Sequence, residues 1–299
     1  MQRTAPARNR APGLTLAATE AANPEWAPWL RLLGRAQAAA SPAWLVHVGL
    51  AEDRGETPLL HEAVLAVDTA RLASWTNELL SAAAPEQRAT RGSAAIDRAI
   101  SIELLEAAIA LDADRLDALA ERMGEEAPRL AATMQLVAMP VLLACRARLA
   151  AEILRGWGRG YCPVCAAWPA FAEIRGLQRE RRARCGRCAC DWRFDVLQCP
   201  YCGEREHDLL AGLVVEGEEE TRRVDTCKRC GGYLKALAML MAVPDQQVPI
   251  VDLESVELDL VANERGFARP EGPAVAMRIR VCDLREVTSG MDGRKWLFS

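Results

Sequence analysis

The chain has 299 residues, of which 51% are hydrophobic and only 5% aromatic, and its formal net charge is −4. This length allows two or three domains, and the aliphatic content is sufficient for a buried core. The small negative charge argues against a general binder of polyanions such as nucleic acids. The most apolar stretch, Leu130 to Cys145, is interrupted by Thr133, Gln135 and Pro140, whereas a membrane-spanning helix needs about 18 uninterrupted apolar residues. We therefore expect no membrane insertion.

Residues 1–22 are rich in alanine, proline, arginine and threonine and show no sustained periodicity. We predict a disordered leader here. The weak apolar stretch around Leu14 to Ala18 does not have the form of a secretory signal. Since proteins that are not exported keep their cysteines reduced, the sequence predicts a cytoplasmic protein.

Residues 23–156 show the spacing of apolar residues that is typical of helices. Asn23 and Thr57 each precede a proline, a combination that marks the start of a helix, and Ser93 is a third candidate cap. About five helices are predicted, and Pro140 is expected to kink the last of them. Four tryptophans are expected in the core of this domain: Trp26, Trp29, Trp44 and Trp75.

Four Cys-x-x-Cys pairs hold eight of the eleven cysteines and give the clearest functional signal. In chain order they are Cys162/Cys165, Cys185/Cys188, Cys199/Cys202 and Cys227/Cys230. Each such turn can present two thiolates to one metal ion, and two turns complete a tetrahedral sulfur site, which suits zinc or iron. The length of the chain argues against a disulfide scaffold, and four copies in series argue against a thioredoxin-type redox motif.

The spacing of the pairs favours two sites, each built from neighbouring pairs. The first two pairs are separated by 19 residues and the last two by 24, so each module has about 40 residues, the lower limit for folding without a staple. The alternative joins the second pair to the third and the first to the fourth. With four protein ligands, neither site keeps an open position for a substrate, and no motif for catalysis is found, so we expect no enzyme.

The residue after each pair distinguishes the two modules. Gly203 and Gly231 follow the last two pairs, whereas Ala166 and Ala189 follow the first two. Because this position of the turn favours a positive φ, we expect the first site to have less regular turns and to be the weaker or more labile one. Cys190, just beyond the second pair, is interpreted as inert or as a minor alternative ligand.

Arginines are concentrated between Arg155 and Arg193, where nine of them face three acidic residues. Most of this run lies within the first metal module. One interpretation is a solvated surface whose arginines offset the charge of the thiolates. The other is a surface for an acidic partner or a nucleic acid.

The cysteine series and its flanks resemble the formate dehydrogenase accessory protein FdhE family. Besides the four pairs themselves, the resemblance rests on Tyr233-Leu234-Lys235 after the last pair and on the segment VDLESVELDLVANERGFAR at residues 251–269. The segment NPEWAPWLRLLGRAQ near the start of the helical part also resembles that family. In all, the resemblance covers roughly residues 24–269.

The resemblance implies a cytoplasmic, non-catalytic maturation factor in which a helical domain is joined to two rubredoxin-like modules. Members of the family act in the biogenesis of respiratory formate dehydrogenase and bind its catalytic subunit before twin-arginine export. The eight cysteines of the pairs would then hold two metal ions, iron or zinc, each through four thiolates. The alternatives are a zinc-ribbon protein that binds nucleic acid and a rubredoxin-like electron carrier.

The predicted fold class is α+β and multidomain, with an N-terminal all-α bundle followed by two small rubredoxin-like or zinc-ribbon-like metal modules. The expected parts are a leader (1–22), a helical domain (23–156), a first module (157–197), a second module (198–248), a C-terminal helix (249–269) and a tail of unknown role (270–299). A homo-oligomer is compatible with the sequence, which assigns no role to Cys145 or Cys282 and does not choose between iron and zinc.

Overall fold

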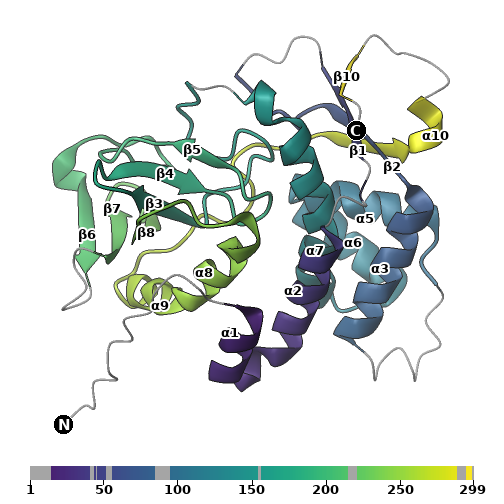
Figure 1. Ribbon diagram of the computed structural model, residues 1–299, viewed down its shortest axis with the longest axis horizontal. Helices are drawn as coiled ribbons and strands as arrows, with labels where there is room; N and C mark the ends of the chain where they lie inside the picture. Colours follow the sequence, from purple (N-terminus) through teal and green to yellow (C-terminus); the bar gives the residue numbers. More distant parts are fainter. Residues whose placement is uncertain are drawn as a thin grey trace.

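In the computed structural model, an N-terminal domain of helices and a small sheet lies beside a second, larger sheet that carries the cysteine pairs (Figure 1). The structure describes residues 15–40, 44, 46–51, 56–84, 95–153, 156–214, 221–287 and 294–297. The mixed helix-and-sheet architecture with two cysteine quartets, expected from the sequence, is confirmed.

The helices of the N-terminal domain bury an apolar face. They are α1 (Leu16–Ala22), α2 (Ala27–Ala39), α3 (Thr69–Ala83), α5 (Arg98–Ala110), α6 (Ala113–Met123) and α7 (Ala127–Arg148), with short 3₁₀ turns at Pro24–Trp26 and Ala150–Glu152. Helices α1, α3, α5 and α6 begin at polar side-chain caps. Asp97 caps α5 by accepting a hydrogen bond from the Ile100 N–H; the expected cap at Ser93 lies outside the described residues. Of the four tryptophans expected in the core, Trp44 and Trp75 are buried, but Trp29 is 38% exposed.

Helix α7 is the central helix of this domain. It has 22 residues and continues through Pro140, and by length and composition it could cross a membrane. However, 61% of its apolar window is buried inside the protein, where it packs against α2, α3, α5 and α6. These contacts are those of a core helix.

The N-terminal domain is not all-helical, contrary to the expectation from the sequence. It contains a sheet of β1 (Val46–Leu50), β2 (Ala63–Val67), β9 (Ile279–Asp283) and β10 (Lys295–Leu297) in the order β10-β1-β2-β9. All five residues of β2 are buried, because the strand lies between two partners under a helical layer. Such a continuous apolar run does not distinguish a strand from a helix, and the helix expected from Thr57 begins only at Thr69.

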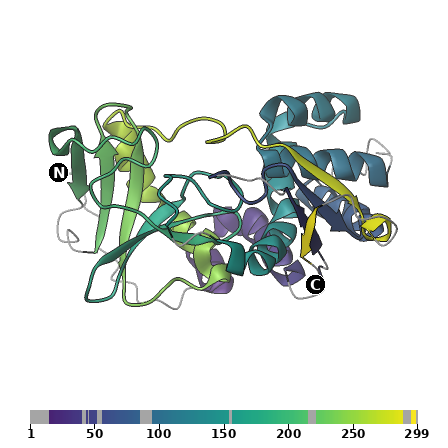
Figure 2. The ribbon, with the colours of Figure 1, turned by 90° about the horizontal axis from the view of Figure 1, so that it is seen from above.

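Both ends of the chain contribute more structure than the sequence suggests. Residues 16–22, which were assigned to the disordered leader, form α1, and Thr19 on α1 is buried and donates a hydrogen bond to Glu254. The expected tail supplies β9, which pairs in parallel with β2, and β10, which pairs with β1; between them lies α10 (Leu284–Val287). Figure 2 shows the segment that leads to β9 crossing from the larger sheet to the N-terminal domain.

The two cysteine modules share one six-stranded sheet. Its strands are β3 (Phe171–Arg175), β4 (Glu180–Arg184), β5 (Asp191–Arg193), β6 (Leu210–Val214), β7 (Arg222–Cys227) and β8 (Tyr233–Met239), in the order β5-β4-β3-β8-β7-β6. Each module forms three antiparallel strands, and the parallel pairing of β3 with β8 joins them. A 3₁₀ turn, His207–Leu209, leads into β6.

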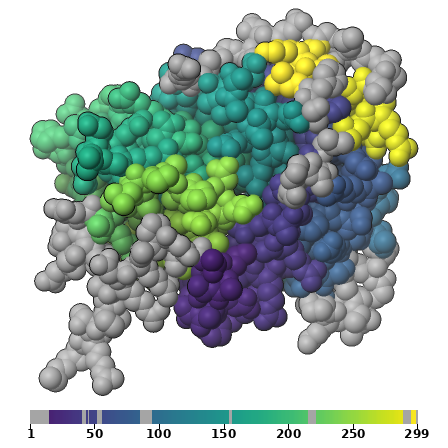
Figure 3. All heavy atoms as spheres, viewed as in Figure 1, coloured from purple at the N-terminus to yellow at the C-terminus, as the bar shows by residue number. Residues whose placement is uncertain are grey.

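The expected C-terminal helix is divided into two. A 3₁₀ turn at Asp245–Gln247 leads into α8 (Val248–Glu254), and α9 (Val256–Glu264) follows after Ser255. Helix α9 contacts β7 and β8, and α8 contacts α1. Figure 3 shows this pair of helices between the larger sheet and α1.

Candidate metal centres

The first cysteine quartet combines the first two pairs, as the spacing favoured. The Sγ atoms of Cys162 and Cys188 are 3.5 Å apart, as are those of Cys165 and Cys185, and Cys165 and Cys188 are separated by 3.7 Å. A tetrahedron with metal–sulfur bonds of about 2.3 Å has sulfur–sulfur edges of about 3.8 Å. All four cysteines are fully buried. The arrangement fits one tetrahedral metal ion with no coordination position left over.

This quartet is anchored in the N-terminal domain on both sides. The carbonyl groups of Pro163 and Val164, inside the first pair, accept hydrogen bonds from the N–H groups of Leu59 and Leu60 (2.8 and 3.0 Å). The side chain of Arg187, inside the second pair, donates to the carbonyl groups of Ala108 and Ile109 at the end of α5. The four cysteines belong to the same apolar core as the helices, so the first site is part of the core of the N-terminal domain.

The second quartet combines Cys199, Cys202, Cys227 and Cys230, and it lies near the surface. The Sγ atoms of Cys199 and Cys230 are 3.6 Å apart, and those of Cys202 and Cys227 are 3.7 Å apart. Cys199 and Cys227 are buried, whereas Cys202 and Cys230 are exposed. The geometry again fits a tetrahedral ion, but here solvent reaches half of the ligands.

All four turns have the same backbone conformation. The residue after each pair has a positive φ: 59° at Ala166, 56° at Ala189, 77° at Gly203 and 69° at Gly231. The expectation of less regular turns in the first module is therefore wrong. Alanine in this conformation costs roughly 1–2 kcal/mol per residue, so the two turns of the first site are strained relative to the glycine turns of the second. Burial has the opposite effect on how readily each site loses its metal, because chelators and water reach the exposed second site more easily than the buried first site.

Burial of the first quartet also bears on its charge. It raises the pKa of Cys162 and Cys188 well above that of an ordinary thiol, because a thiolate without a counterion is unstable in an apolar interior. Metal binding releases these protons and supplies the missing positive charge. The sulfurs are thus arranged for a cation that the surrounding side chains do not provide.

The remaining candidate ligands lie outside both quartets. The thiol of Cys190 is buried next to Cys162 and Cys188 and contacts the carbonyl oxygen of Asp191 at 3.8 Å. His207 is exposed and pairs with Asp208.

A row of four aromatic rings in successive contact extends from the first cysteine site to the second. Trp157, Tyr161, Trp168 and Tyr201 pack edge to face, with ring centroids 5.6, 6.1 and 5.1 Å apart in that order. Tyr161 precedes the first pair, and Tyr201 lies inside the third. The hydroxyl group of Tyr201 donates to the carbonyl oxygen of Tyr233 at 2.7 Å. This hydrogen bond fixes the Tyr201 ring within the second module. The packing of Tyr201 against Trp168 then holds the turn of the second site against the first module.

Glycine at position 160 is required for this packing, which gives a testable prediction. A Cβ atom at Gly160 would lie 1.8 Å from the carbonyl oxygen of Pro200, whereas one at Gly158 would have no heavy atom nearer than 3.9 Å. We expect Gly160→Ala to lower the free energy of unfolding by about 1–3 kcal/mol, the cost of overpacking. The matched control Gly158→Ala should change it by less than about 0.5 kcal/mol. Urea unfolding measures both, and equal effects would show that the contact does not matter.

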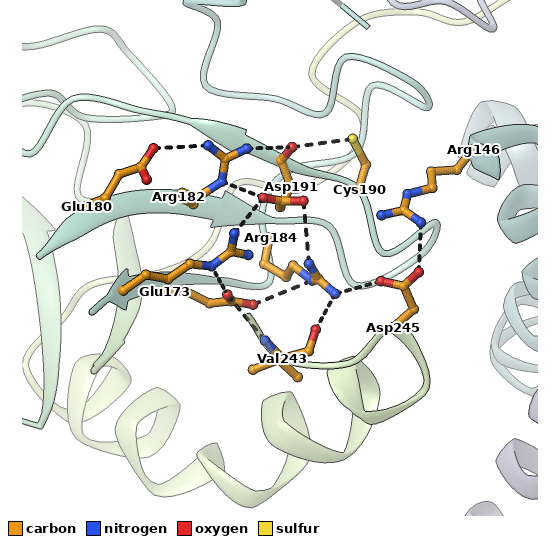
Figure 4. A network of polar contacts seen from close by, with 10 residues as sticks. Arg146, Glu173, Glu180, Arg182, Arg184, Cys190, Asp191, Val243 and Asp245 are labelled. Carbon is orange, nitrogen blue, oxygen red and sulfur yellow. Dashed lines mark hydrogen bonds and ion pairs between the residues drawn. The ribbon is translucent and has the colours of Figure 1, made fainter. Parts of the chain in front are cut away.

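The arginine run is used inside the molecule. Arg184 is 2% exposed, forms ion pairs with Glu173 and Asp191, and donates hydrogen bonds to Asp245 (2.9 Å) and to the carbonyl oxygen of Val243 (Figure 4). On the other side of Asp245, Arg146 of α7 donates to the same carboxylate at 2.7 Å. This network fastens the first module to the N-terminal domain.

Other members of the run are engaged as well. Arg175 pairs with Glu173 and Asp191, and Arg182 also pairs with Asp191. Burial raises the pKa of Asp191, but the neighbouring guanidinium groups outweigh it, and the pKa lies below its ordinary value. Among the arginines of this run that the structure describes, few are left to form a surface for nucleic acid.

A second buried cluster of charged side chains brings together residues of the Tyr233-Leu234-Lys235 motif and of the segment 251–269, both of which follow the last cysteine pair. Lys235 is completely buried, and its Nζ lies 2.7 Å from Asp252 and 2.8 Å from Asp259. Arg269 pairs with Asp259 at 2.9 Å, and the hydroxyl group of Tyr233 donates to the same carboxylate. Burial alone would raise the pKa of Asp259, but the two cations hold it below its ordinary value. The cluster fastens α8 and α9 to β8.

Comparison with known proteins gives matches in sequence and in fold, although no protein-family model matches the chain. An FdhE homolog of Aquifex aeolicus is 35% identical over 121 residues, which cover 38% of this chain and 41% of that protein. FdhE of Salmonella choleraesuis is 34% identical over 118 residues, 38% of this chain and 37% of that protein. The matched segment thus spans less than half of the length of these curated relatives.

The likeness of fold extends further than the likeness of sequence. The crystal structure of the FdhE protein from Pseudomonas aeruginosa has a TM-score of 0.50 to this structure, with 24% sequence identity, over 88% of this chain and 93% of that one. The segment of related sequence and the fold point to proteins of the same name. The resemblance to the FdhE family that the cysteine series indicates is therefore confirmed.

Proposed function

We propose that this chain is a cytoplasmic accessory factor in the maturation of formate dehydrogenase, and that it binds the catalytic subunit of that enzyme before export. The observation that carries the proposal is the pair of closed cysteine quartets, built into a fold like that of FdhE. Because each quartet supplies four protein ligands, neither leaves a coordination position for a substrate. The sites therefore serve a binding protein better than an enzyme.

We further propose that the eight cysteines of the quartets hold two metal ions, iron or zinc, each through four thiolates. In a module of about 40 residues such an ion contributes on the order of 10 kcal/mol to folding. Elemental analysis gives the metal-to-protein ratio. Visible absorption separates a red iron–thiolate protein from a colourless zinc protein.

A second function is favoured by one observation, the exposure of Cys202 and Cys230. If the second site holds iron, these sulfurs bring it within reach of a redox partner, as in an electron carrier. Reversible bleaching of the iron–thiolate bands by a one-electron reductant supports this role. A protein isolated with two zinc ions has no such activity.

The maturation role predicts a specific defect in cells. A strain that lacks this chain should make the catalytic subunit but lose most formate dehydrogenase activity, and the tagged chain should restore the activity and co-purify with the subunit. An unrelated metalloenzyme assayed in the same extracts controls for a general defect in metal supply. Normal formate dehydrogenase activity in the deletion strain, together with no association, would refute the proposal.

A further inference from the structure

Strand β6 forms a free edge of the six-stranded sheet within the described residues. It pairs with β7 on one side, and the sheet order ends at β6. Figure 1 shows β6 at the outer end of the sheet, away from the N-terminal domain. A free edge presents a row of unpaired N–H and C=O groups, which can bind another strand.

The pairing register identifies which backbone groups face outward. The Lys228 N–H donates to the carbonyl oxygen of Leu209 at 2.8 Å, which makes these two residues a hydrogen-bonded pair. In an antiparallel ladder the hydrogen-bonded pairs alternate along the strand, so Ala211 and Leu213 also bond to β7. The N–H and C=O groups of Gly212 and Val214 consequently point to the free edge, as does the carbonyl group of Leu210, whereas the Leu210 N–H donates to the carbonyl oxygen of His207.

The edge at β6 lacks the features that usually prevent strand addition. Its sequence, LAGLV, has no charge and no proline, and a Cβ atom at Gly212 would have no heavy atom within 4 Å. The opposite edge is different: β5 has only three residues, and its Asp191 is bound to arginines of neighbouring strands. Short, charged edges resist addition. The β6 edge has five uncharged residues, and no other strand in the described part of the chain pairs with it.

A groove lies directly behind β6. It has a volume of about 410 Å³, and its floor is formed by β6, β7 and the segment before the third cysteine pair. Val196, Leu197 and Val214 on its sides are each more than half exposed. Every second side chain of an added strand would pack in this apolar groove. Sheet edges recognise extended peptides in this way, through backbone pairing combined with pockets for alternate side chains.

One partly exposed guanidinium group in the groove indicates the chemistry of its partner. Asp225 is flanked by two guanidinium groups: Arg181 donates to one carboxylate oxygen and Arg223 to the other (2.9 and 2.8 Å). Among these three side chains, the positive charges exceed the negative charge by one. Arg181 is buried, but the side chain of Arg223 is 29% exposed and uses its Nε for Asp225. Its terminal N–H groups remain for an acceptor such as a carboxylate.

We propose that β6 and this groove bind an extended segment of the partner protein as an added seventh strand. The segment carries aliphatic side chains at alternate positions and an acidic side chain opposite Arg223. The proposal rests on the proposed function for the identity of the partner, the catalytic subunit of formate dehydrogenase. It assigns the contact to the free edge of the larger sheet.

Two variants of one residue test the proposal. Gly212→Pro removes an outward N–H group, whereas the bonds from Ala211 and Leu213 to β7 remain, and proline is tolerated on an edge strand in this orientation. Gly212→Ala keeps the N–H group and serves as the matched control. With full-length, metal-loaded protein and the purified catalytic subunit, we expect Gly212→Pro to weaken binding at least tenfold and Gly212→Ala to change it less than threefold. Arg223→Gln should weaken binding by a smaller factor.

Amide hydrogen exchange of the complex provides a second measurement. The amides of Gly212 and Val214 should become protected on binding, while those of Ala211 and Leu213 are protected in the free protein as well. Equal affinities of wild type and Gly212→Pro, with protection elsewhere, would refute this inference and leave the proposed function intact. No binding by the wild type would refute the proposed function itself. A wild-type dimer that Gly212→Pro converts to a monomer would show that a second copy takes this edge, which also refutes the proposal.

Discussion

Replacing Cys185 with serine is expected to unfold the N-terminal domain together with the first module. Cys185 is fully buried in the core that contains the helices, so a metal ion lost from this site leaves a defect in that core. The contribution of a structural zinc ion, on the order of 10 kcal/mol or more, is comparable to the whole stability of an ordinary domain, roughly 5–15 kcal/mol. Far-UV circular dichroism and solubility should show loss of the folded protein.

Cys202→Ser is the matched control in the second site. Cys202 is exposed, and none of the four cysteines of its quartet belongs to the core that contains the helices of the N-terminal domain. We expect this variant to stay folded, to bind one metal ion instead of two, and to keep the thermal transition of the N-terminal domain within a few degrees. Comparable losses from the two substitutions would contradict the unequal coupling of the two sites to the core.

The second large effect is expected in the buried ion network around Glu173. The Glu173 side chain is completely buried between Arg175 and Arg184. Glu173→Gln therefore removes their fully buried counterion and leaves them only the partly exposed carboxylates of Asp191 and Asp245. Removing one partner of a buried ion pair costs about 3–5 kcal/mol. Urea unfolding of the metal-loaded protein should show a loss of this size.

Glu180 provides the control for Glu173 in the same network. Its side chain is 46% exposed and pairs with Arg182, and exposed pairs contribute about 0–1 kcal/mol. Glu180→Gln should therefore leave the urea midpoint nearly unchanged. If Glu173→Gln and Glu180→Gln lower the free energy of unfolding by the same amount, the buried ion pairs of this network do not contribute more to stability than the exposed one.

The sequence predicted the quartets well because their chemistry is local. Two cysteines in one short turn already determine where two thiolates point, and the spacing between turns indicates which turns meet. The expectation for Ala166 and Ala189 failed because it considered the turn alone. The core around the first site stabilises a conformation that alanine adopts rarely.

Strand β4 of the larger sheet and the whole N-terminal sheet were harder to predict, for different reasons. Strand β4 has three arginines in five residues, and its arginines pair with acids on other strands and on the turn before α8, which a local pattern does not show. The apolar run of β2 fits a helix until its partners are known, and β9 comes from more than 200 residues away. Likewise, the marks at Lys235 and Arg269 were recognisable as a motif, but only the fold shows that they share one carboxylate.

The pairing of β2 with β9 has a consequence for how the chain is made. A chain emerges from the ribosome with its N-terminus first, so β1 and β2 emerge long before β9 and β10, the strands that flank them in the sheet. Domains generally fold as they emerge, and contacts between distant residues form slowly. The cysteine turns can therefore meet metal before the first domain has closed. The N-terminal sheet can therefore close only after residues 279–297, which supply β9 and β10, have been translated.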